Sequence, residues 1–140
     1  MKLFSRMMRK PDASPGTLAQ NTSLIETTLS REGDELVFTA TNHGNEPARF
    51  CVFMTPFEGF RGDILEVIDS RGTPMEYLGI QIKRKPPEER HFMTLAPSEA
   101  RRTAFVLSKE YGLTGQPPYT VRFKGTPDIN GLADSNLTTS

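Results

Sequence analysis

Apolar residues occur through most of this chain in short runs, and turn-forming residues separate one run from the next. The clearest run covers residues 35–42, where Leu36, Phe38 and Ala40 stand at every second position. A period of two is typical of a β-strand with one buried face. The other runs are also rich in β-branched and aromatic residues, which favour strands over helices.

Eight of these runs are predicted to be strands: residues 24–29, 35–42, 48–54, 64–68, 75–82, 91–95, 100–107 and 119–124. Apolar residues fall on both faces of 48–54, which predicts a central strand. Helix is expected to be limited to one turn at most, within 108–113. Short strands that recur between turn signals predict an all-β fold, specifically an immunoglobulin-like antiparallel β-sandwich of about 7–8 strands.

One domain is expected at residues 23–125, because a chain of 140 residues has room for a single core. Pro, Gly, Ser and Ala are frequent near the N-terminus, so residues 1–22 are predicted to be a flexible leader and linker. Basic and apolar residues there also fit a short amphipathic anchor, although Pro11 and Pro15 keep such a helix marginal. Residues 126–140 are polar and are predicted to form a flexible tail.

The overall charge argues against two classes of partner. The chain has 17 basic and 17 acidic residues, so no strong field would attract nucleic acid or an anionic membrane. No apolar stretch approaches membrane-spanning length, and membrane insertion is therefore not expected. We expect a monomer whose partner is another protein.

Residues for catalysis or metal binding are scarce. The histidines are His43 and His91 and the single cysteine is Cys51, whereas a catalytic zinc usually takes three protein ligands. The HExxH, G-x-S-x-G and phosphate-loop patterns are absent. Cys51 lies in a predicted strand, where a cysteine is normally a small buried hydrophobe and not a nucleophile, even beside a histidine. We therefore predict no enzyme activity, no catalytic or metal site and no cofactor.

The connection at 55–63 is the first candidate binding site. Its candidate residues are Phe57, Glu58, Phe60, Arg61 and Asp63. Aromatic side chains beside arginine in a loop are typical of binding surfaces. The alternative is that both phenylalanines close the open end of the sandwich, while the arginine and the aspartate cap the turn.

The charged segment 83–90 is a second candidate site. Lys83, Arg84 and Lys85 form a basic cluster that precedes two prolines and an acidic pair. These three residues are a secondary binding hypothesis. The alternative is a solvated edge, because lysine and proline also protect edge strands from aggregation.

Several segments together resemble the N-terminal pro-domain of secreted deuterolysin-type (aspzincin) zinc metallopeptidases. The most specific segment is T-P-F-E-G-F-R-G-D at 55–63. The others are T-N-H-G-N-E-P at 41–47, Y-L-G at 77–79 with K-R at 83–84, L-A-P-S-E at 95–99 and Y-T-V-R-F at 119–123. The likeness covers residues 23–124, and the peptidase domain that carries HExxH in that family is missing from this sequence.

The resemblance implies an immunoglobulin-like domain that binds a metallopeptidase in trans and inhibits it or assists its folding. Glu58 or Asp63 would then approach the zinc or a basic subsite of the partner, and Phe57 or Phe60 would fill an apolar pocket. A secreted or periplasmic location follows from the same resemblance, whereas a native and complete N-terminus would place the protein in the cytoplasm.

Two other functions stay open at this point. A structural or adhesive module of an envelope or surface assembly would recognise its partner through an edge strand or through residues 83–90. A cytosolic domain similar to the bacterial intracellular proteinase inhibitors would share the sandwich layout and would need no signal peptide.

Overall fold

The predicted all-β class is confirmed. The structure, a computed structural model, describes residues 22–139 and has ten strands within that range, paired antiparallel. Helix is limited there to α1 (Leu107–Glu110) and the 3-10 turns η1 (Thr22–Leu24), η2 (Pro56–Glu58) and η3 (Glu89–His91). Apart from Thr22, the leader predicted at 1–22 lies outside the described residues.

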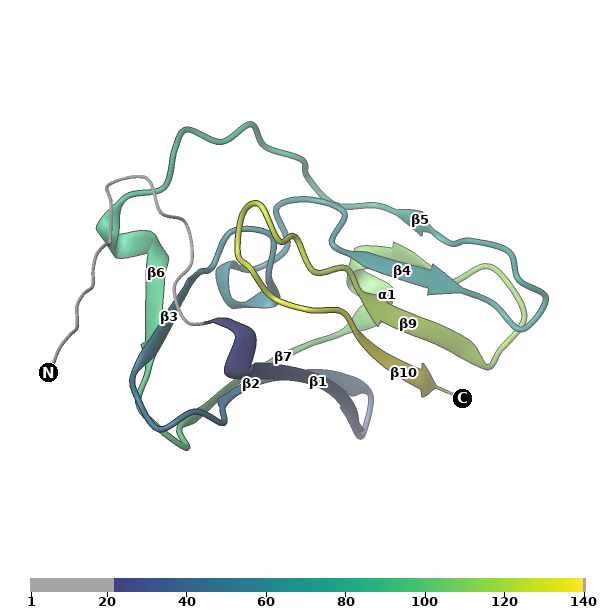
Figure 1. Cartoon of the computed structure of the whole chain (residues 1–140). Coiled ribbons are helices and arrows are strands. Elements are labelled where there is room, and N and C mark those ends of the chain that lie inside the picture. The colour runs from purple at the N-terminus through teal and green to yellow at the C-terminus, as the bar shows by residue number, and fades with distance from the viewer. Residues whose placement is uncertain (1–21, 140) are drawn as a thin grey trace, which may run out of the picture.

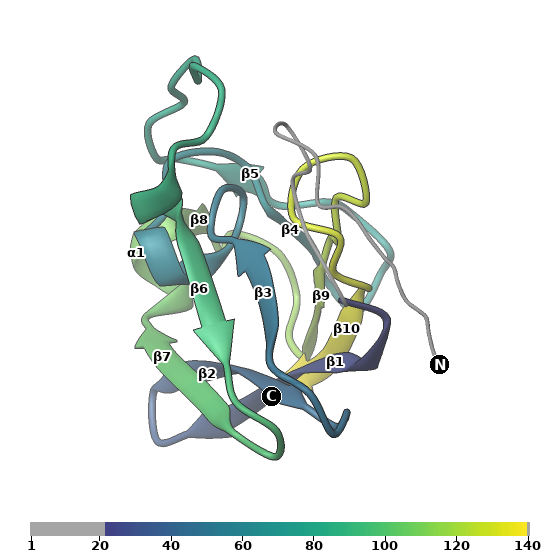
Figure 2. The same ribbon diagram turned by 60° about the vertical axis from the view of Figure 1, so that its left-hand side comes forward.

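Two three-stranded sheets form the main layers (Figure 1). One sheet has the order β1 (Ile25–Glu32), β2 (Glu35–Asn42), β7 (Ala100–Phe105), and the other β10 (Ser135–Thr139), β9 (Tyr119–Phe123), β4 (Leu65–Ile68). The shorter pairs are β3 (Ala48–Cys51) with β6 (Phe92–Leu95), visible side by side in Figure 2, and β5 (Glu76–Tyr77) with β8 (Tyr111–Gly112). The layers make a β-sandwich, whereas the immunoglobulin-like strand order stays a prediction.

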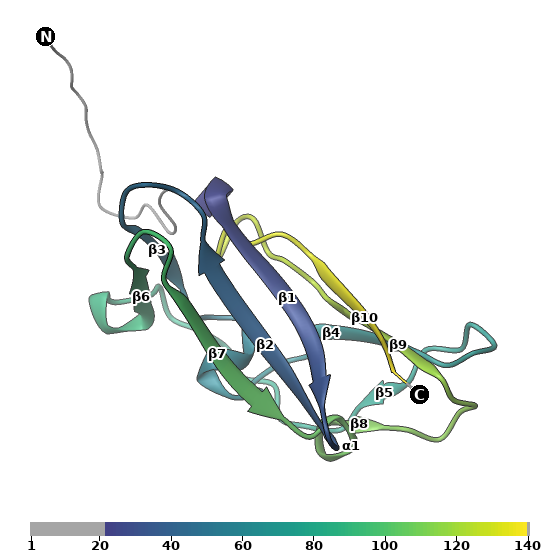
Figure 3. The same ribbon diagram turned by 90° about the horizontal axis from the view of Figure 1, so that it is seen from below.

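The core lies between the two larger sheets, which Figure 3 shows from below. Leu36, Phe38 and Ala40 of β2 are all buried as predicted, and Val37, predicted on the opposite face, is buried as well. The ring of Phe38 lies 4.7 Å from the ring of Phe123 in β9 and so joins one sheet to the other. Aromatic pairs of this kind contribute roughly 0.5 to 1.5 kcal/mol beyond the burial of their surface.

Two predicted strands are shorter than expected. The run 48–54 was expected to be a central strand, but β3 ends at Cys51 and pairs within the described residues only with β6. Met54 has a φ of 61°, a left-handed conformation that ends the extended run. Of the run 75–82, only Glu76 and Tyr77 pair with a neighbouring strand.

The C-terminal segment corrects the predicted tail at 126–140, because β10 pairs with β9. The side chain of Asn130, fully buried, ties this segment to the sandwich: its Nδ2 donates to the Phe53 carbonyl at 3.0 Å and its Oδ1 accepts from the Leu132 N–H at 3.0 Å. A polar side chain that satisfies buried backbone groups leaves no trace in a hydrophobic pattern, which is why the sequence predicted a loose tail.

Asp69 organises the turn between β4 and β5. Its carboxylate accepts backbone hydrogen bonds from Gln116 at 3.0 Å, Thr73 at 2.8 Å and Arg71 at 3.0 Å. These N–H donors, the one from Gln116 above all, hold the pKa of Asp69 below its ordinary value of 3.8.

We expect the Asp69→Asn variant to be less stable than the wild type at neutral pH and to lose less of its stability on acidification. The lowered pKa means that the unfolded chain takes up a proton first, so the contribution of Asp69 is complete above pH 3.8 and is lost as the pH falls through its folded pKa. Urea unfolding over a series of pH values measures both effects. Parallel pH profiles for the two proteins would contradict this role.

Candidate functional site

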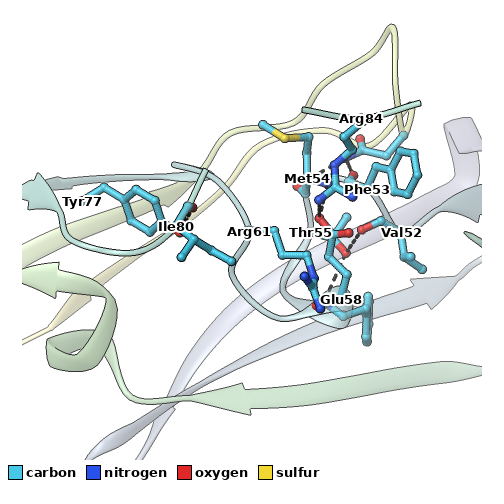
Figure 4. A network of polar contacts seen from close by, with 11 residues as sticks. Val52, Phe53, Met54, Thr55, Glu58, Arg61, Tyr77, Ile80 and Arg84 are labelled. Carbon is cyan, nitrogen blue, oxygen red and sulfur yellow. Dashed lines mark hydrogen bonds and ion pairs between the residues drawn. The ribbon is translucent and has the colours of Figure 1, made fainter. Parts of the chain in front are cut away.

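The loop at 55–63, called here the 55–63 loop, is fixed at its start by a capped turn. The Thr55 hydroxyl accepts a hydrogen bond from the Phe57 N–H at 3.2 Å and donates to the Val52 carbonyl at 2.7 Å (Figure 4). Pro56 occupies the first turn of η2, and Gly59, with a φ of 77°, ends it. The loop is therefore ordered before any partner binds.

Both phenylalanines of the 55–63 loop pack inward. The Phe57 ring lies 5.4 Å from the ring of Phe38 and 5.9 Å from that of Phe50. The Phe60 ring lies 4.9 Å from the ring of Phe105 at the end of β7. Of the two sequence interpretations, this geometry is that of residues that close the end of the core.

Glu58 and Arg84, predicted in two separate sites, meet in one ion pair. Their side chains are only 10% and 19% exposed, and the Glu58 carboxylate also accepts a hydrogen bond from the Met54 N–H at 3.0 Å. Burial raises the pKa of Glu58, while the Met54 N–H and the guanidinium oppose that rise. The guanidinium carbon of Arg84 lies 4.2 Å from the centre of the Phe53 ring. Figure 4 shows the two side chains next to each other.

Sequence reasoning missed the residues that complete this cluster. Phe53 contacts both the Arg84 guanidinium and the imidazole of His91, whose ring centre is 4.7 Å from that of Phe53. The Nδ1 of His91 accepts the Glu88 N–H at 2.8 Å, so the histidine supports η3. Phe53 is an apolar residue just before a predicted loop, and nothing in the local sequence indicates that a cation stacks on its ring. Its partners Arg84 and His91 are far away in the sequence.

Asp63 belongs to a structural hydrogen-bond network. Its carboxylate accepts from the Tyr111 hydroxyl at 2.5 Å and lies 3.8 Å from the Lys124 ammonium. The same hydroxyl accepts the Leu65 N–H at 3.0 Å, which places a buried polar group at the start of β4. Burial above all, and then the bond to Asp63, raise the pKa of Tyr111. Asp63 therefore supports a strand and a buried tyrosine.

The exposed apolar surface lies in a different segment, residues 78–85, which we call the 78–85 strip. Leu78 and Ile80 are each 57% exposed and Ile82 is 41% exposed. The remaining residues include Lys83 and Lys85, both exposed. Figure 1 shows the chain leaving β5 and rising away from the sheets before η3. The prediction of a strand over 75–82 is wrong for this part.

The 78–85 strip is held against the body at separate points. The Leu78 N–H donates to the Glu110 carbonyl at 2.8 Å, and the Ile82 N–H donates to the Arg61 carbonyl at 3.1 Å. The Tyr77 hydroxyl donates to the Ile80 carbonyl at 2.7 Å, a contact drawn in Figure 4. The predicted sites thus meet here, because Arg61 and Arg84 connect the 55–63 loop to the strip.

Within residues 22–139, no group of three or more His, Cys, Asp or Glu residues is placed to hold a metal ion. Cys51 is buried in β3, and burial raises the pKa of its thiol. None of the helices in the described range has the length and apolar character needed to cross a membrane.

No protein-family model matches the chain, and no curated protein sequence matches it. The resemblance to deuterolysin-type pro-domains therefore rests on the residues quoted above.

Proposed function

We propose that this chain is a non-catalytic β-sandwich that binds another protein through the 78–85 strip. The observation that carries the proposal is the grouping of Leu78, Ile80 and Ile82, three of the large exposed apolar side chains of the described residues, in one short segment. Contiguous exposed apolar surface marks interaction sites in soluble proteins. Because the strip is already held to the body by hydrogen bonds, docking would order little additional chain.

We further propose that the partner is a metallopeptidase, which the domain inhibits or helps to fold in trans. The support is the residue resemblance, whose segments 55–63, 77–79 and 83–84 all contribute to the loop and the strip. In this proposal the 55–63 loop acts as a support. Glu58 holds Arg84 in place instead of approaching the zinc of the partner, and the phenylalanines pack into the core instead of entering a pocket.

A structural or adhesive module is the second candidate, and the same strip favours it. That hypothesis expected recognition through residues 83–90 or an edge strand, not through the aromatic loop. The inward packing of Phe57 and Phe60 and the exposure of Lys83 and Lys85 agree with this expectation. The two candidates differ in the identity of the partner and share the surface.

Isothermal titration calorimetry of the domain against a zinc-loaded deuterolysin-type catalytic domain tests the peptidase assignment. We expect saturable binding. Casein hydrolysis is measured in parallel and should be slower if the domain inhibits the peptidase. Binding without slower hydrolysis would favour the folding role, to be checked by refolding the peptidase with and without the domain. If no heat of binding is detected at two temperatures, the metallopeptidase assignment fails and the structural module takes its place.

A further inference from the structure

We infer that the 78–85 strip binds an extended peptide segment of the partner in which apolar and acidic side chains alternate. This inference rests on one part of the proposed function, that the domain binds a protein, and does not require the partner to be a metallopeptidase.

The spacing of the apolar residues is the first argument. Leu78, Ile80 and Ile82 occupy alternate positions along the 78–85 strip. In an extended peptide, alternate side chains project to the same side. Their exposures, 57%, 57% and 41%, leave a large part of each side chain accessible to a partner. A partner in the extended conformation presents side chains with the same period and can meet this row residue by residue.

Unused backbone donors are the second argument. The N–H groups of Gly79, Ile80 and Gln81 form no hydrogen bond with any described residue, and no described strand pairs with this segment. An extended peptide that lies along such an edge gains main-chain hydrogen bonds as well as side-chain contacts. The edge therefore favours an extended ligand over a helix, whose backbone groups are already paired.

The conformation of this edge is set by Tyr77 and Gly79. A Cβ at residue 79 would come within 2.4 Å of the Tyr77 hydroxyl, so only glycine allows the tyrosine to lie this close. The same hydroxyl donates to the Ile80 carbonyl at 2.7 Å. This contact holds the middle of the strip, and the ordering cost on binding is correspondingly small.

Charge gives the third argument and selects acidic ligands. Lys83 and Lys85 are exposed, and neither forms an ion pair with another residue in 22–139. Arg61, whose carbonyl accepts the Ile82 N–H, is also exposed and is a third basic residue next to the strip, with its Nε donating to the Glu58 carbonyl at 3.3 Å. The acidic residues that follow are engaged, Glu88 by Arg90 at 3.2 Å and Glu89 by Arg49 at 2.6 Å. Complementary charge on the partner would speed association and fix the register of the peptide.

Fluorescence anisotropy with a labelled Glu-Val-Glu-Val-Glu-Val-Glu peptide tests the inference. We expect saturable binding to the full chain, and binding that is weaker by about tenfold when serine replaces valine or lysine replaces glutamate. Equal binding of the serine peptide would overturn the apolar part of the inference. Absence of binding of the Glu-Val peptide would overturn the whole, even if the metallopeptidase still binds in calorimetry.

Variants locate the binding on the strip. Ile80→Ser and the double variant Lys83→Glu/Lys85→Glu should each weaken peptide binding by about tenfold. The matched control for the first is Leu24→Ser, at a residue 55% exposed in η1, and it should bind like the wild type. An equal loss in Leu24→Ser and Ile80→Ser would contradict the assignment.

A charge-matched control completes the design. The variant Arg31→Glu/Arg71→Glu changes the net charge by as much as Lys83→Glu/Lys85→Glu, at exposed residues outside the strip. It should bind the peptide like the wild type, and an equal loss would show attraction by net charge alone. Sedimentation with phosphatidylserine vesicles tests whether the basic residues of the strip bind an anionic membrane surface instead of a peptide. Retention on vesicles without peptide binding would replace the peptide by a membrane surface and overturn the inference.

Discussion

Replacing Phe57 with alanine is expected to lower the free energy of unfolding by roughly 2 to 4 kcal/mol, even though the residue lies in a loop. Its ring contacts Phe38 and Phe50, both fully buried, at 5.4 and 5.9 Å between ring centres. Truncation would remove both contacts and leave a cavity at the end of the core. The effect is smaller than for a fully buried phenylalanine because Phe57 is half-buried. Equilibrium unfolding in urea measures it.

Leu78→Ala is the control for this experiment, since Leu78 is a large apolar residue that is 57% exposed. Its substitution should change the free energy of unfolding by less than about 0.5 kcal/mol. A Phe57→Ala protein as stable as the wild type would contradict the inward packing, and Phe57 would again be a candidate for direct contact with a partner.

Breaking the ion pair between Glu58 and Arg84 is the second change with a large expected effect. Arg84→Met removes the counter-charge of the Glu58 carboxylate, whose side chain is only 10% exposed. This substitution should lower the free energy of unfolding by roughly 2 to 4 kcal/mol. Burial already raises the pKa of Glu58, so this variant should recover stability as the pH falls and the carboxylate takes up a proton. Glu58→Ala should be destabilised too, because it removes the acceptor of the Met54 N–H.

The double variant Glu58→Gln/Arg84→Met separates the pair from its surroundings. Glutamine keeps an oxygen for the Met54 N–H, and methionine keeps apolar contact with Phe53. Together with the singles Glu58→Gln and Arg84→Met it forms a double-mutant cycle, and we expect a coupling of about 1 to 3 kcal/mol. Single-variant effects that add to within about 0.5 kcal/mol would show that the two residues do not stabilise each other.

The sandwich could be predicted because its strands obey a local rule. In β2 the alternation of Leu36, Phe38 and Ala40 places every second residue in the core, and the predicted range 35–42 agrees with the observed strand. β10 escaped prediction because Ser135–Thr139 is polar and gains its place from pairing with β9, a contact that no local pattern records.

The candidate site was predicted in composition but not in arrangement. The residue types of the 55–63 loop and of Lys83, Arg84 and Lys85 drew attention to two segments that the structure joins through Glu58 and Arg84. Whether an aromatic in a loop points outward or inward depends on partners distant in the sequence, as Phe57 shows with Phe38. The exposure of Leu78, Ile80 and Ile82 could not be predicted either. Their alternation along the sequence also fits a strand that is paired in a sheet.

Site-specific photo-crosslinking tests the central claim, that the 78–85 strip is the surface through which this domain binds a protein. Benzoylphenylalanine is placed at residue 80 in one protein and at residue 24 in another, since both native side chains are large and more than half exposed. Each is irradiated with the deuterolysin-type catalytic domain used in calorimetry and, separately, with protein extract of the source organism. We expect a discrete adduct from position 80 that excess unlabelled wild-type domain suppresses, and no such adduct from position 24. Competed adducts from position 24 alone, or equally from both, would show that the partner binds elsewhere.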